Sequence, residues 1–423
     1  MKQVAIATDI LNFDPAYSIC RVVADQCKML VRNGYTPRLL VRSGFHHLHD
    51  NAYAGAEIVE LDHGDSIGNN EVVITETIDL DVFRLQKQMT EALAGVQVVL
   101  THDLIYQENL WLAHLVAKRI AHERGDLHWL HWVHSSTKKD VWKKTKQYRK
   151  EMQQSFPNSH LVAMHPEEVN RKGTLFGYEW DKIDIIPNPV DFLADFHPAA
   201  VQAVEKLDLM RADIVGIYPC RLDRGKQPHV LIEVFAGLQD MGYDARVVIV
   251  DLHSTAGDKA DYRKQMQTLA EKRKVPVLFT SSLEGEENGA PYNYCIPHKA
   301  VMDLMQLADV LVHPSMSECD PLILPEAAWA RCGLVLNFDL PVFRQYDGRV
   351  LFGKFSSSVD VNTGMPGGTK VEYGNRAQYM RGIAAAIAYE MEQNPAHFLH
   401  RKARQERSLE GAWHKLEGAI ERQ

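Results

Sequence analysis

The chain has 423 residues, of which 45% are hydrophobic and 24% are charged, and its formal net charge is −8. A single hydrophobic core rarely grows beyond about 250–300 residues, so this length predicts two domains. The composition is typical of a soluble globular protein, and no stretch approaches the roughly 18 uninterrupted apolar residues of a membrane helix. The excess of acidic residues argues against a protein that coats nucleic acid along its whole surface.

The positions of the cysteines and histidines argue against a disulfide framework and against a metal site. No two of the six cysteines form a C-x-x-C pair, which favours a reducing cytoplasm as the location. Three of the 20 histidines, His46, His47 and His49, cluster in one polar segment. Such a cluster is more often polar surface than a ligand set, because spacing alone does not create ligand geometry. We therefore predict no bound metal.

Short apolar runs alternate with helix-like segments in the first half of the chain. Residues 4–7 predict a buried strand, and Asp14 and Pro15 predict the start of the helix that follows, as its N-cap and first residue. The other strands predicted in this half are 38–41, 96–100, 129–133, 160–163 and 183–186. Strands that alternate with helices indicate βαβ units and a parallel sheet.

A second alternating series follows an irregular, proline-containing stretch at 188–210, which we interpret as a hinge. The strands predicted in this series are 213–218, 245–250, 275–279, 310–313 and 334–337. The sequence thus predicts two doubly wound domains, with ligand bound where the carboxyl ends of their strands face a cleft. At the C-terminus, Leu409, Trp413, Leu416 and Ile420 recur at helical spacing and predict an amphipathic helix.

Three cations lie in the loop after the first strand of the second series. These are Arg221, Arg224 and Lys226, and a helix is predicted from about Pro228. Cations beside a helix N-terminus suit a diphosphate, because charge-assisted hydrogen bonds add to the helix dipole. A solvated basic turn is an equally good interpretation of this loop alone.

Two glutamates flank the start of a later helix. Glu318 follows the strand at 310–313, and Asp320 and Pro321 resemble an N-cap and a first-turn proline. Pro325 leaves open whether the helix starts at Pro321 or only near Pro325, and Glu326 lies on its first or second turn. Free backbone N–H groups at the helix start and two carboxylate acceptors suit a sugar, a diphosphate and a ribose. An ordinary capped helix with one surface and one paired glutamate is the alternative.

Together these motifs resemble those of the retaining glycosyltransferases of family 4, also called group 1. The resemblance rests on the spacing of the arginine and lysine of the basic loop and on P-S-x-S-E followed seven residues later by E-A-A. Three further motifs that match are L-T-H-D at 100–103, W-V-H-S at 132–135 and I-I-P-N-P-V-D at 185–191.

The resemblance implies the GT-B fold, an α/β architecture of two Rossmann-like doubly wound domains facing a central cleft. It implies an acceptor-binding domain at 1–190 and a nucleotide-sugar-binding domain at 191–395. A C-terminal helix at 396–423 would pack back on the first domain.

The resemblance also implies a role for each matching residue. Arg221 and Lys226 would hold the diphosphate. Glu318 would bind hydroxyls of the donor sugar, and Glu326 would bind those of the ribose. His134 would touch the sugar near the reacting carbon and would complete the catalytic set with Arg221, Lys226 and Glu318. The further donor-binding residues implied are Ser18, Cys319, Asp320, Pro321 and Leu322.

Acceptor binding is predicted for residues of the first domain. These residues are His102, Asp103, Lys139, Lys143 and Lys146. The three lysines belong to a basic stretch at 138–150, where they would form one stripe of a helix. The stripe is either a solvated helix face or a surface for a polyanion, such as an anionic membrane or DNA.

The resemblance therefore implies a retaining, metal-independent hexosyl- or pentosyltransferase that uses a nucleotide-diphosphate sugar and no cofactor. The acceptor would be a saccharide, a lipid-linked glycan or a hydroxymethylated DNA base. A nucleotide-sugar epimerase or phosphorylase and an inactive GT-B binding protein are the alternatives from other classes. The predicted location is cytoplasmic, with binding to the inner membrane surface as a further option.

Overall fold

A computed structural model describes most of the chain, and it divides the chain into two compact units. The described residues are 2–63, 67–68, 71–72, 78–134, 149–253, 257–285, 291–292, 294–360 and 365–422. Unit 1 comprises Met1–Asp191 and Glu406–Gln423, and unit 2 comprises Phe192–Gln405. The chain thus re-enters unit 1 at Glu406, whereas the sequence predicts the return at 396. No described helix has the length and apolar character needed to cross a bilayer.

Unit 1 is built on a seven-stranded sheet in which neighbouring strands are parallel. In sheet order the strands are β3 (Glu57–Leu61), β2 (Tyr35–Arg42), β1 (Lys2–Ala7), β6 (Val96–His102), β7 (His128–Trp132), β8 (Ser159–Ala163) and β9 (Ile183–Ile185). All six strands predicted from apolar runs are confirmed. The edge strand β3 is an addition, because Glu60 separates Ile58 and Val59 from Leu61, so its apolar residues form neither a continuous run nor a regular alternation.

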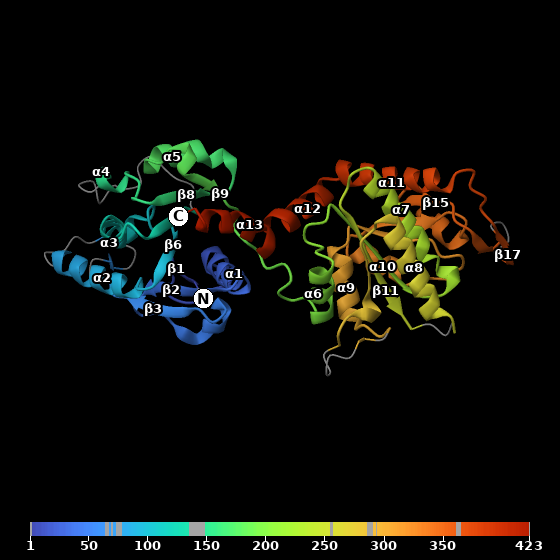
Figure 1. Ribbon diagram of the computed structural model, residues 1–423, viewed down its shortest axis with the longest axis horizontal. Coiled ribbons are helices and arrows are strands. Elements are labelled where there is room, and N and C mark those ends of the chain that lie inside the picture. Colours follow the sequence, from blue (N-terminus) through green and yellow to red (C-terminus); the bar gives the residue numbers. More distant parts are fainter. Residues whose placement is uncertain are drawn as a thin grey trace. The chain divides into compact units, whose positions relative to one another are not determined.

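Helices cover both faces of this sheet, and the alternation of side chains along β1 decides which residues meet which helices. Val4 and Ile6 pack in one core with α1 (Ser18–Arg32) and α13 (Leu409–Ile420). Ala5 and Ala7 pack in the opposite core with α2 (Ile78–Ala92) and α3 (Trp111–Glu123). The alternating faces follow from the period of two residues in a strand. In Figure 1 the red helix α13 lies beside the blue helix α1.

The remaining described elements of unit 1 are short. They are η1 (His47–Tyr53), β4 (Ile67–Gly68), β5 (Glu71–Val72), η3 (Glu108–Leu110), α4 (Arg149–Met152), η5 (Pro166–Glu168), α5 (Val169–Phe176) and η6 (Trp180–Lys182).

The predicted start of the first helix is wrong by three residues. Helix α1 begins at Ser18 rather than Pro15, and no side chain of the described residues caps it. The Asp14 side chain instead accepts a hydrogen bond from the backbone N–H of Ala16 at 2.8 Å, and the N–H of Tyr17 bonds to the Asp14 carbonyl at 3.0 Å. These two bonds close a separate turn before the helix, which is an alternative that aspartate offers the backbone.

Unit 2 is built on a six-stranded parallel sheet. In sheet order the strands are β12 (Val277–Phe279), β11 (Ala245–Leu252), β10 (Ile214–Arg221), β13 (Val310–His313), β14 (Gly333–Asn337) and β15 (Leu351–Gly353). The five predicted strands are confirmed, and β15 is an addition at the edge. Two parallel, doubly wound sheets confirm the predicted α/β fold class of two Rossmann-like domains.

Two layers of helices and a small antiparallel pair accompany this sheet. The helices are α6 (Pro198–Lys206), α7 (Pro228–Asp240), α8 (Lys259–Arg273), α9 (His298–Leu307), α10 (Ile323–Trp329), α11 (Arg376–Gln393) and α12 (Pro395–Arg407). The shorter pieces are η7 (Arg224–Lys226), η8 (Thr280–Ser282), η9 (Pro341–Tyr346), β16 (Ser357–Val359) and β17 (Pro366–Thr369). Helices α7, α8 and α11 contribute to one core, and α6 and α9 contribute to the other.

The predicted hinge at 188–210 is wrong in its second half, where α6 forms. Pro198 occupies the first turn of α6, and the ring of His197 accepts a hydrogen bond from the Ala199 N–H at 3.2 Å. A proline at this position interrupts nothing, because the first N–H groups of a helix have no partner within it. The apolar face of α6 then packs into the core of unit 2.

Close approach of α7 to the sheet explains a glycine in the middle of β10. A Cβ atom at Gly216 would lie 2.2 Å from the ring of Phe235, on α7. Glycine therefore lets the helix pack directly on the strand, which fixes the loop that joins them. The start of α7 at Pro228 confirms the predicted helix.

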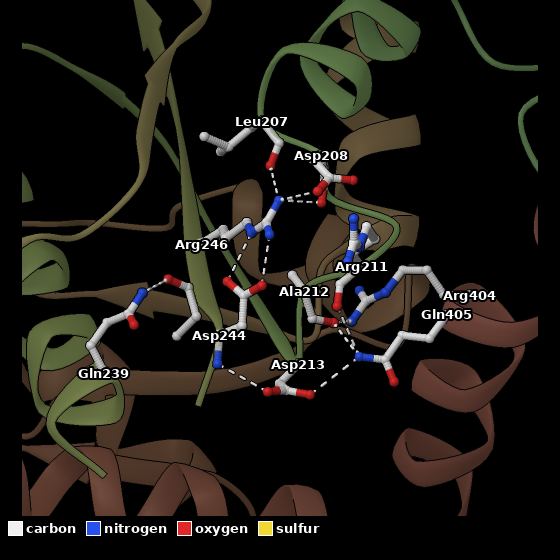
Figure 2. A network of polar contacts seen from close by, with 11 residues as sticks. Leu207, Asp208, Arg211, Ala212, Asp213, Gln239, Asp244, Arg246, Arg404 and Gln405 are labelled. Carbon is white, nitrogen blue, oxygen red and sulfur yellow. Dashed lines mark hydrogen bonds and ion pairs between the residues drawn. The ribbon is translucent and has the colours of Figure 1, made fainter. Parts of the chain in front are cut away.

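A network of polar contacts holds the amino-terminal edge of the second sheet (Figure 2). The Arg246 guanidinium, on β11, donates to the two carboxylate oxygens of Asp244 at 2.8 and 2.6 Å. It also donates to the carbonyl of Leu207 at 2.7 Å. The backbone N–H of Asp244 donates to the Asp213 carboxylate at 2.9 Å. Since Asp213 directly precedes β10, these contacts fix the starts of two neighbouring strands.

The last turn of α12 joins this network. Gln405 Nε2 donates to Asp213 Oδ1 at 3.2 Å. Arg404 donates to the carbonyl of Ala212 at 2.8 Å and pairs with the buried Asp309 at 3.2 Å. Burial by itself would raise the pKa of Asp309, but the Arg404 charge and further hydrogen bonds bring it below its usual range. Helix α12 is thus anchored to unit 2 as far as Gln405.

Candidate functional site

The carboxyl edge of the second sheet brings a lysine and a glutamate together. Lys226 ends the short turn η7 that follows β10, and Glu318 lies in the loop that follows β13. Because β10 and β13 are parallel neighbours, both loops leave the same edge of the sheet. Lys226 Nζ donates to Glu318 Oε1 at 2.5 Å, and the side chains are only 19% and 13% exposed. The pair is therefore largely shielded from water.

Two buried side chains, Tyr218 and His313, lie beside this pair. The Tyr218 hydroxyl donates to the carbonyl of Lys226 at 3.0 Å and lies 3.4 Å from Nδ1 of His313. The other ring nitrogen of His313 lies 3.6 Å from Glu318 Oε1. Burial lowers the pKa of His313 to about 4, against the opposing effect of Glu318. His313 is thus neutral at pH 7, and Lys226 is the charge partner of Glu318.

A second set of hydrogen bonds joins the two loops. Gln227 has a left-handed backbone conformation, with φ of 52°, and its Nε2 donates to the carbonyl of Pro314 at 2.7 Å. The backbone N–H of Met316 donates to the carbonyl of Gly225 at 2.7 Å. From β14, Asn337 Nδ2 donates to the carbonyl of Ser315 at 3.0 Å. These bonds make the two loops one rigid support for Lys226 and Glu318.

The other cations of the basic loop lie further from the glutamate. The Arg221 side chain is 53% exposed, and its Nε lies 3.2 Å from the carboxylate of Asp223. Arg224 pairs with Asp258 at 3.0 Å, and its guanidinium lies 5.0 Å from the ring centroid of Tyr262. Of the three cations, Lys226 is the one that the structure places against Glu318.

The segment after Glu318 departs from its predicted geometry. Helix α10 has seven residues, and its N-cap residue is Leu322, with no side-chain cap among the described residues. The prediction of Asp320 as the cap is wrong. Pro325 has no N–H to bond to the carbonyl of Pro321, so the backbone first makes a tight turn, with the N–H of Leu324 bonded to that carbonyl at 3.1 Å. Cys319 and Asp320 are exposed in the preceding loop.

Glu326 does not join the Lys226–Glu318 pair through any described contact. Its Oε1 lies 3.0 Å from Nε2 of His298, at the first position of α9. The two side chains are 30% and 70% exposed. The partner His298 carries no signal in the sequence, because it depends on how α9 packs beside α10.

In unit 1 the predicted histidines lie in contact. Nδ1 of His102, at the end of β6, lies 2.7 Å from Nε2 of His134, which follows β7, and the rings stack with centroids 5.0 Å apart. The Asp103 carboxylate accepts the backbone N–H of His134 at 2.7 Å, and Asp103 itself has a φ of 55°. Ser18 is the exposed first residue of α1. Lys139, Lys143 and Lys146 lie outside the described residues.

A pocket of about 450 Å³ opens at the carboxyl ends of β1 and β6. It is lined by Thr8, Asp9, Ile10, Tyr17, Ile19, His102, Asp103, Gln107, Glu108, Asn109 and Leu110. Asp9 is a residue that the sequence reasoning missed, although it directly follows the first strand. Its carboxylate accepts from Asn109 at 3.2 Å and lies 3.7 Å from Arg42, and burial raises its pKa.

The cluster of His46, His47 and His49 is exposed, and His47 already has carboxylate partners. The two ring nitrogens of His47 lie 2.9 Å from Asp50 and 3.2 Å from Glu60. The ring therefore links η1 to β3 and is already satisfied by carboxylates.

Residues 204–337, all within unit 2, match the family model described as "Glycosyl transferases group 1". Unit 2 thus contains a segment that is similar to the group 1 glycosyltransferases. The matched segment contains both Lys226 and Glu318, so the rigid pair lies within the part of the chain that resembles this family. No curated protein matches the chain in sequence.

Solved structures of low identity align along nearly the whole chain. A glycosyltransferase from Rickettsia africae is 14% identical, with 99% of this chain and 98% of that chain covered and a TM-score of 0.37. Sucrose-phosphate synthase from Thermosynechococcus elongatus is 15% identical, with 99% and 98% covered and a TM-score of 0.35. The Anabaena HepE protein in complex with UDP-glucose is 12% identical, with 99% of both chains covered and a TM-score of 0.35. Similarity at this level says nothing of activity.

Proposed function

We propose that the protein is a retaining glycosyltransferase that moves a hexosyl or pentosyl group from a nucleotide-diphosphate sugar to a hydroxyl acceptor, without a metal ion. The Lys226–Glu318 pair, within the segment that resembles the group 1 glycosyltransferases, is the observation that carries this proposal. A donor of this class has an anionic diphosphate next to a hydroxyl-rich sugar. An ammonium and a carboxylate held 2.5 Å apart match these two chemical groups.

The chemistry of the pair follows from its hydrogen-bonding capacity. The ammonium of Lys226 has three donors, and Glu318 uses one of them, so the others are available to diphosphate oxygens. The Glu318 carboxylate accepts hydrogen bonds from sugar hydroxyls. As the bond between the sugar carbon and the phosphate oxygen breaks, negative charge grows on the diphosphate, and Lys226 stabilises it. Arg221, exposed in the same loop, adds a second cation on ligand binding.

No described carboxylate is assigned as a general base in this proposal. The acceptor oxygen bonds to the sugar carbon on the face from which the diphosphate departs. The acceptor's proton passes to the departing phosphate oxygen, so the reaction balances without a further group. Retention of configuration then follows from attack and departure on the same face.

A saccharide or lipid-linked glycan is the acceptor class that we favour over DNA. The pocket of unit 1 is lined by the carboxylates of Asp9, Asp103 and Glu108. Negative charge in the pocket repels a phosphate backbone, whereas carboxylates accept hydrogen bonds from sugar hydroxyls. The basic stretch that favours a polyanion lies outside the described residues. All six cysteines are free thiols, which supports the proposed cytoplasmic location.

The experiment that tests the proposal is release of nucleoside diphosphate. The protein is incubated with UDP-, GDP- and ADP-sugars, with and without a panel of saccharide acceptors, and the products are separated by chromatography. We expect one donor to release its nucleoside diphosphate and to raise the melting temperature in a saturable way. Interconversion of the sugar without release would indicate an epimerase. Stabilisation without any turnover would indicate a binding protein.

We further expect the transfer reaction to survive chelation. Rates of nucleoside diphosphate release are compared before and after dialysis against excess EDTA, with Mg²⁺ or Mn²⁺ added back in a third sample. Lys226 and Arg221 supply the positive charge that a metal would otherwise bring to the diphosphate. Loss of turnover on chelation that Mg²⁺ restores would show that the leaving group needs a metal.

A further inference from the structure

Three polar side chains from different elements form a continuous chain of hydrogen bonds in unit 1. Gln26 lies on α1, His102 ends β6, and His134 follows β7. Gln26 Oε1 lies 2.8 Å from His102 Nε2, and His102 Nδ1 lies 2.7 Å from His134 Nε2. Gln26 is fully buried and His102 is 1% exposed, whereas His134 is partly exposed. The chain therefore runs from the core outward and ends at His134.

With the amide oxygen of Gln26 directed at His102, the order of donors and acceptors assigns a position to each proton. The amide oxygen of Gln26 can only accept, so Nε2 of His102 carries a proton and donates it. Burial, followed by the nearby His134, holds the pKa of His102 well below its usual range, so His102 is neutral. Its Nδ1 then has a lone pair and accepts. Nε2 of His134 must therefore donate to His102.

We propose that Gln26 and His102 are positioning residues that hold His134 as its Nε2–H tautomer, so that Nδ1 of His134 accepts a hydrogen bond from a substrate hydroxyl. The proposal rests on the proposed function and on the role that the family resemblance implies for His134, a contact with the donor sugar near the reacting carbon. No contact among the described residues uses Nδ1 of His134. A neutral imidazole with one nitrogen occupied as a donor offers the other as an acceptor.

The surroundings of His134 hold the ring in place and keep it neutral. Asp103 accepts its backbone N–H at 2.7 Å. The fully buried Lys172 donates to the carbonyl of the preceding residue, Val133, at 2.6 Å and to Glu168 at 2.7 Å. Burial lowers the pKa of His134 most, Lys172 lowers it further, and Asp103 and Glu168 oppose the shift. The net lowering keeps Nδ1 unprotonated at neutral pH.

Nitrogen NMR reads the tautomer directly. Full-length protein is labelled with ¹⁵N-histidine, and the His134 ring signals are assigned by their loss in His134→Gln. At pH 7.5 we expect a protonated Nε2 and an unprotonated Nδ1 on His134. A protonated Nδ1 in the wild-type protein would overturn the proposal. This measurement needs neither donor nor turnover, so it stands apart from a failure of the proposed function.

Gln26→Met tests whether the glutamine sets the tautomer. Methionine keeps the length and apolar volume of the side chain but removes the acceptor, so we expect the His134 signals to move to a mixture of the two tautomers. If the His134 pattern stayed that of the wild type, Gln26 would have no positioning role. Under saturating acceptor, kcat/KM for the donor should fall by up to about tenfold, the effect of one misplaced hydrogen bond. Should this variant fail to fold, the wild-type spectrum still decides the proposal.

Thr101→Val is the matched control. Thr101 Oγ1 lies 2.8 Å from Nδ1 of the buried His131, so the variant also removes a hydrogen bond to a buried histidine. Thr101 precedes His102 on β6 and therefore points to the opposite face of the sheet. We expect this control to shift the His131 signals and to leave those of His134 unchanged. A change at His134 in this control would mean that its tautomer responds to any loosening of the sheet.

Discussion

Lys226→Ala should lower kcat/KM for the donor by about 10²- to 10³-fold, the loss found when one preorganised donor to a developing negative charge is removed. The structure adds a second effect. The Glu318 carboxylate is only 13% exposed and would keep only the neutral His313 beside it. Leaving a shielded carboxylate without its cation is destabilising, so the melting temperature of the unliganded protein should also fall.

Two variants separate these effects. The double variant Lys226→Met with Glu318→Gln removes both charges, and it should recover much of the lost melting temperature without recovering turnover. Arg224→Ala is the matched control, because Arg224 is a 60% exposed cation of the same turn whose partner is Asp258. We expect that control to bind donor almost as the wild type does. If nucleoside diphosphates stabilised Lys226→Ala as strongly as the wild type, Lys226 would have no part in donor binding.

Unit 1 should unfold at a higher pH than unit 2 as the solution is acidified. The described histidines of unit 1 whose pKa is lowered, with burial as the largest cause, are His63, His102, His114, His128, His131 and His134. Those of unit 2 are His229, His313 and His397. On acidification, more histidines of unit 1 than of unit 2 would therefore bind a proton only in the unfolded state.

The sign of the effect follows from linkage between protons and folding. An unfolded histidine has a pKa near 6.5 and binds a proton below that pH, while the buried ring stays neutral. Stability is fully present above about pH 6.5 and is lost as the pH falls toward the folded pKa. Burial lowers the pKa of His63 to about 4 and that of His114 to about 3. At pH 5 each of these two histidines lowers the free energy of unfolding by about 2 kcal/mol. This is a large share of the total free energy of unfolding of a domain, which is roughly 5–15 kcal/mol.

Two optical probes distinguish the units. All tryptophans except Trp329 lie in the residue ranges of unit 1, and Trp329 is 83% exposed already. Tryptophan fluorescence therefore reports unit 1, whereas far-ultraviolet circular dichroism reports both units. Between pH 7.5 and pH 5, we expect the urea concentration at the midpoint of the fluorescence transition to fall. It should fall by more than the midpoint of the transition that circular dichroism follows. Coincident transitions at every pH would contradict this.

His114→Leu gives the sharpest version of this test. His114 is fully buried against Phe156, and neither ring nitrogen has a hydrogen-bond partner among the described residues. Leucine cannot be protonated, so the variant should not lose this stability on acidification. From pH 7.5 to pH 5, the free energy of unfolding of the variant should rise by about 2 kcal/mol relative to that of the wild type. The exposed His414, replaced by leucine, is the control and should show no such gain.

The sequence predicts the framework of the candidate site better than its details. Lys226 and Glu318 are 92 positions apart, yet parallel strands bring the loops at their carboxyl ends to one edge, so their meeting follows from the strand pattern. The buried supports Tyr218 and His313 are not predictable this way, because an aromatic or a histidine within a strand usually signals only core. Gln26 is a similar case, since its contact with His102 depends on how α1 packs across the sheet.

Errors in the predicted elements arise from proline and from edge strands. The sequence predicts Pro198 as part of a hinge, but it occupies the first turn of α6, where a missing N–H costs nothing. Pro325 leaves the start of the later helix open in the sequence, and α10 begins at Ile323, between the two starts considered. Strand β3 is not predicted, because Glu60 interrupts its short apolar run and leaves no regular alternation. A proline or a short apolar run is visible in the sequence. Whether it starts a helix, interrupts one or forms an edge strand depends on where the segment packs in the fold.

The chain order of the two units has a consequence for the way the protein is made. Unit 2 is one continuous segment, whereas unit 1 closes with α13, whose Trp413 and Leu416 pack in the same core as Val4 and Ile6. The N–H of Val190 also bonds to the carbonyl of Arg407 at 2.7 Å, so the outgoing and returning segments meet. During translation, residues 192–405 are complete before α13 leaves the ribosome. The domain made first must therefore wait, with one face of its central sheet incompletely covered, until the domain made second has been synthesised.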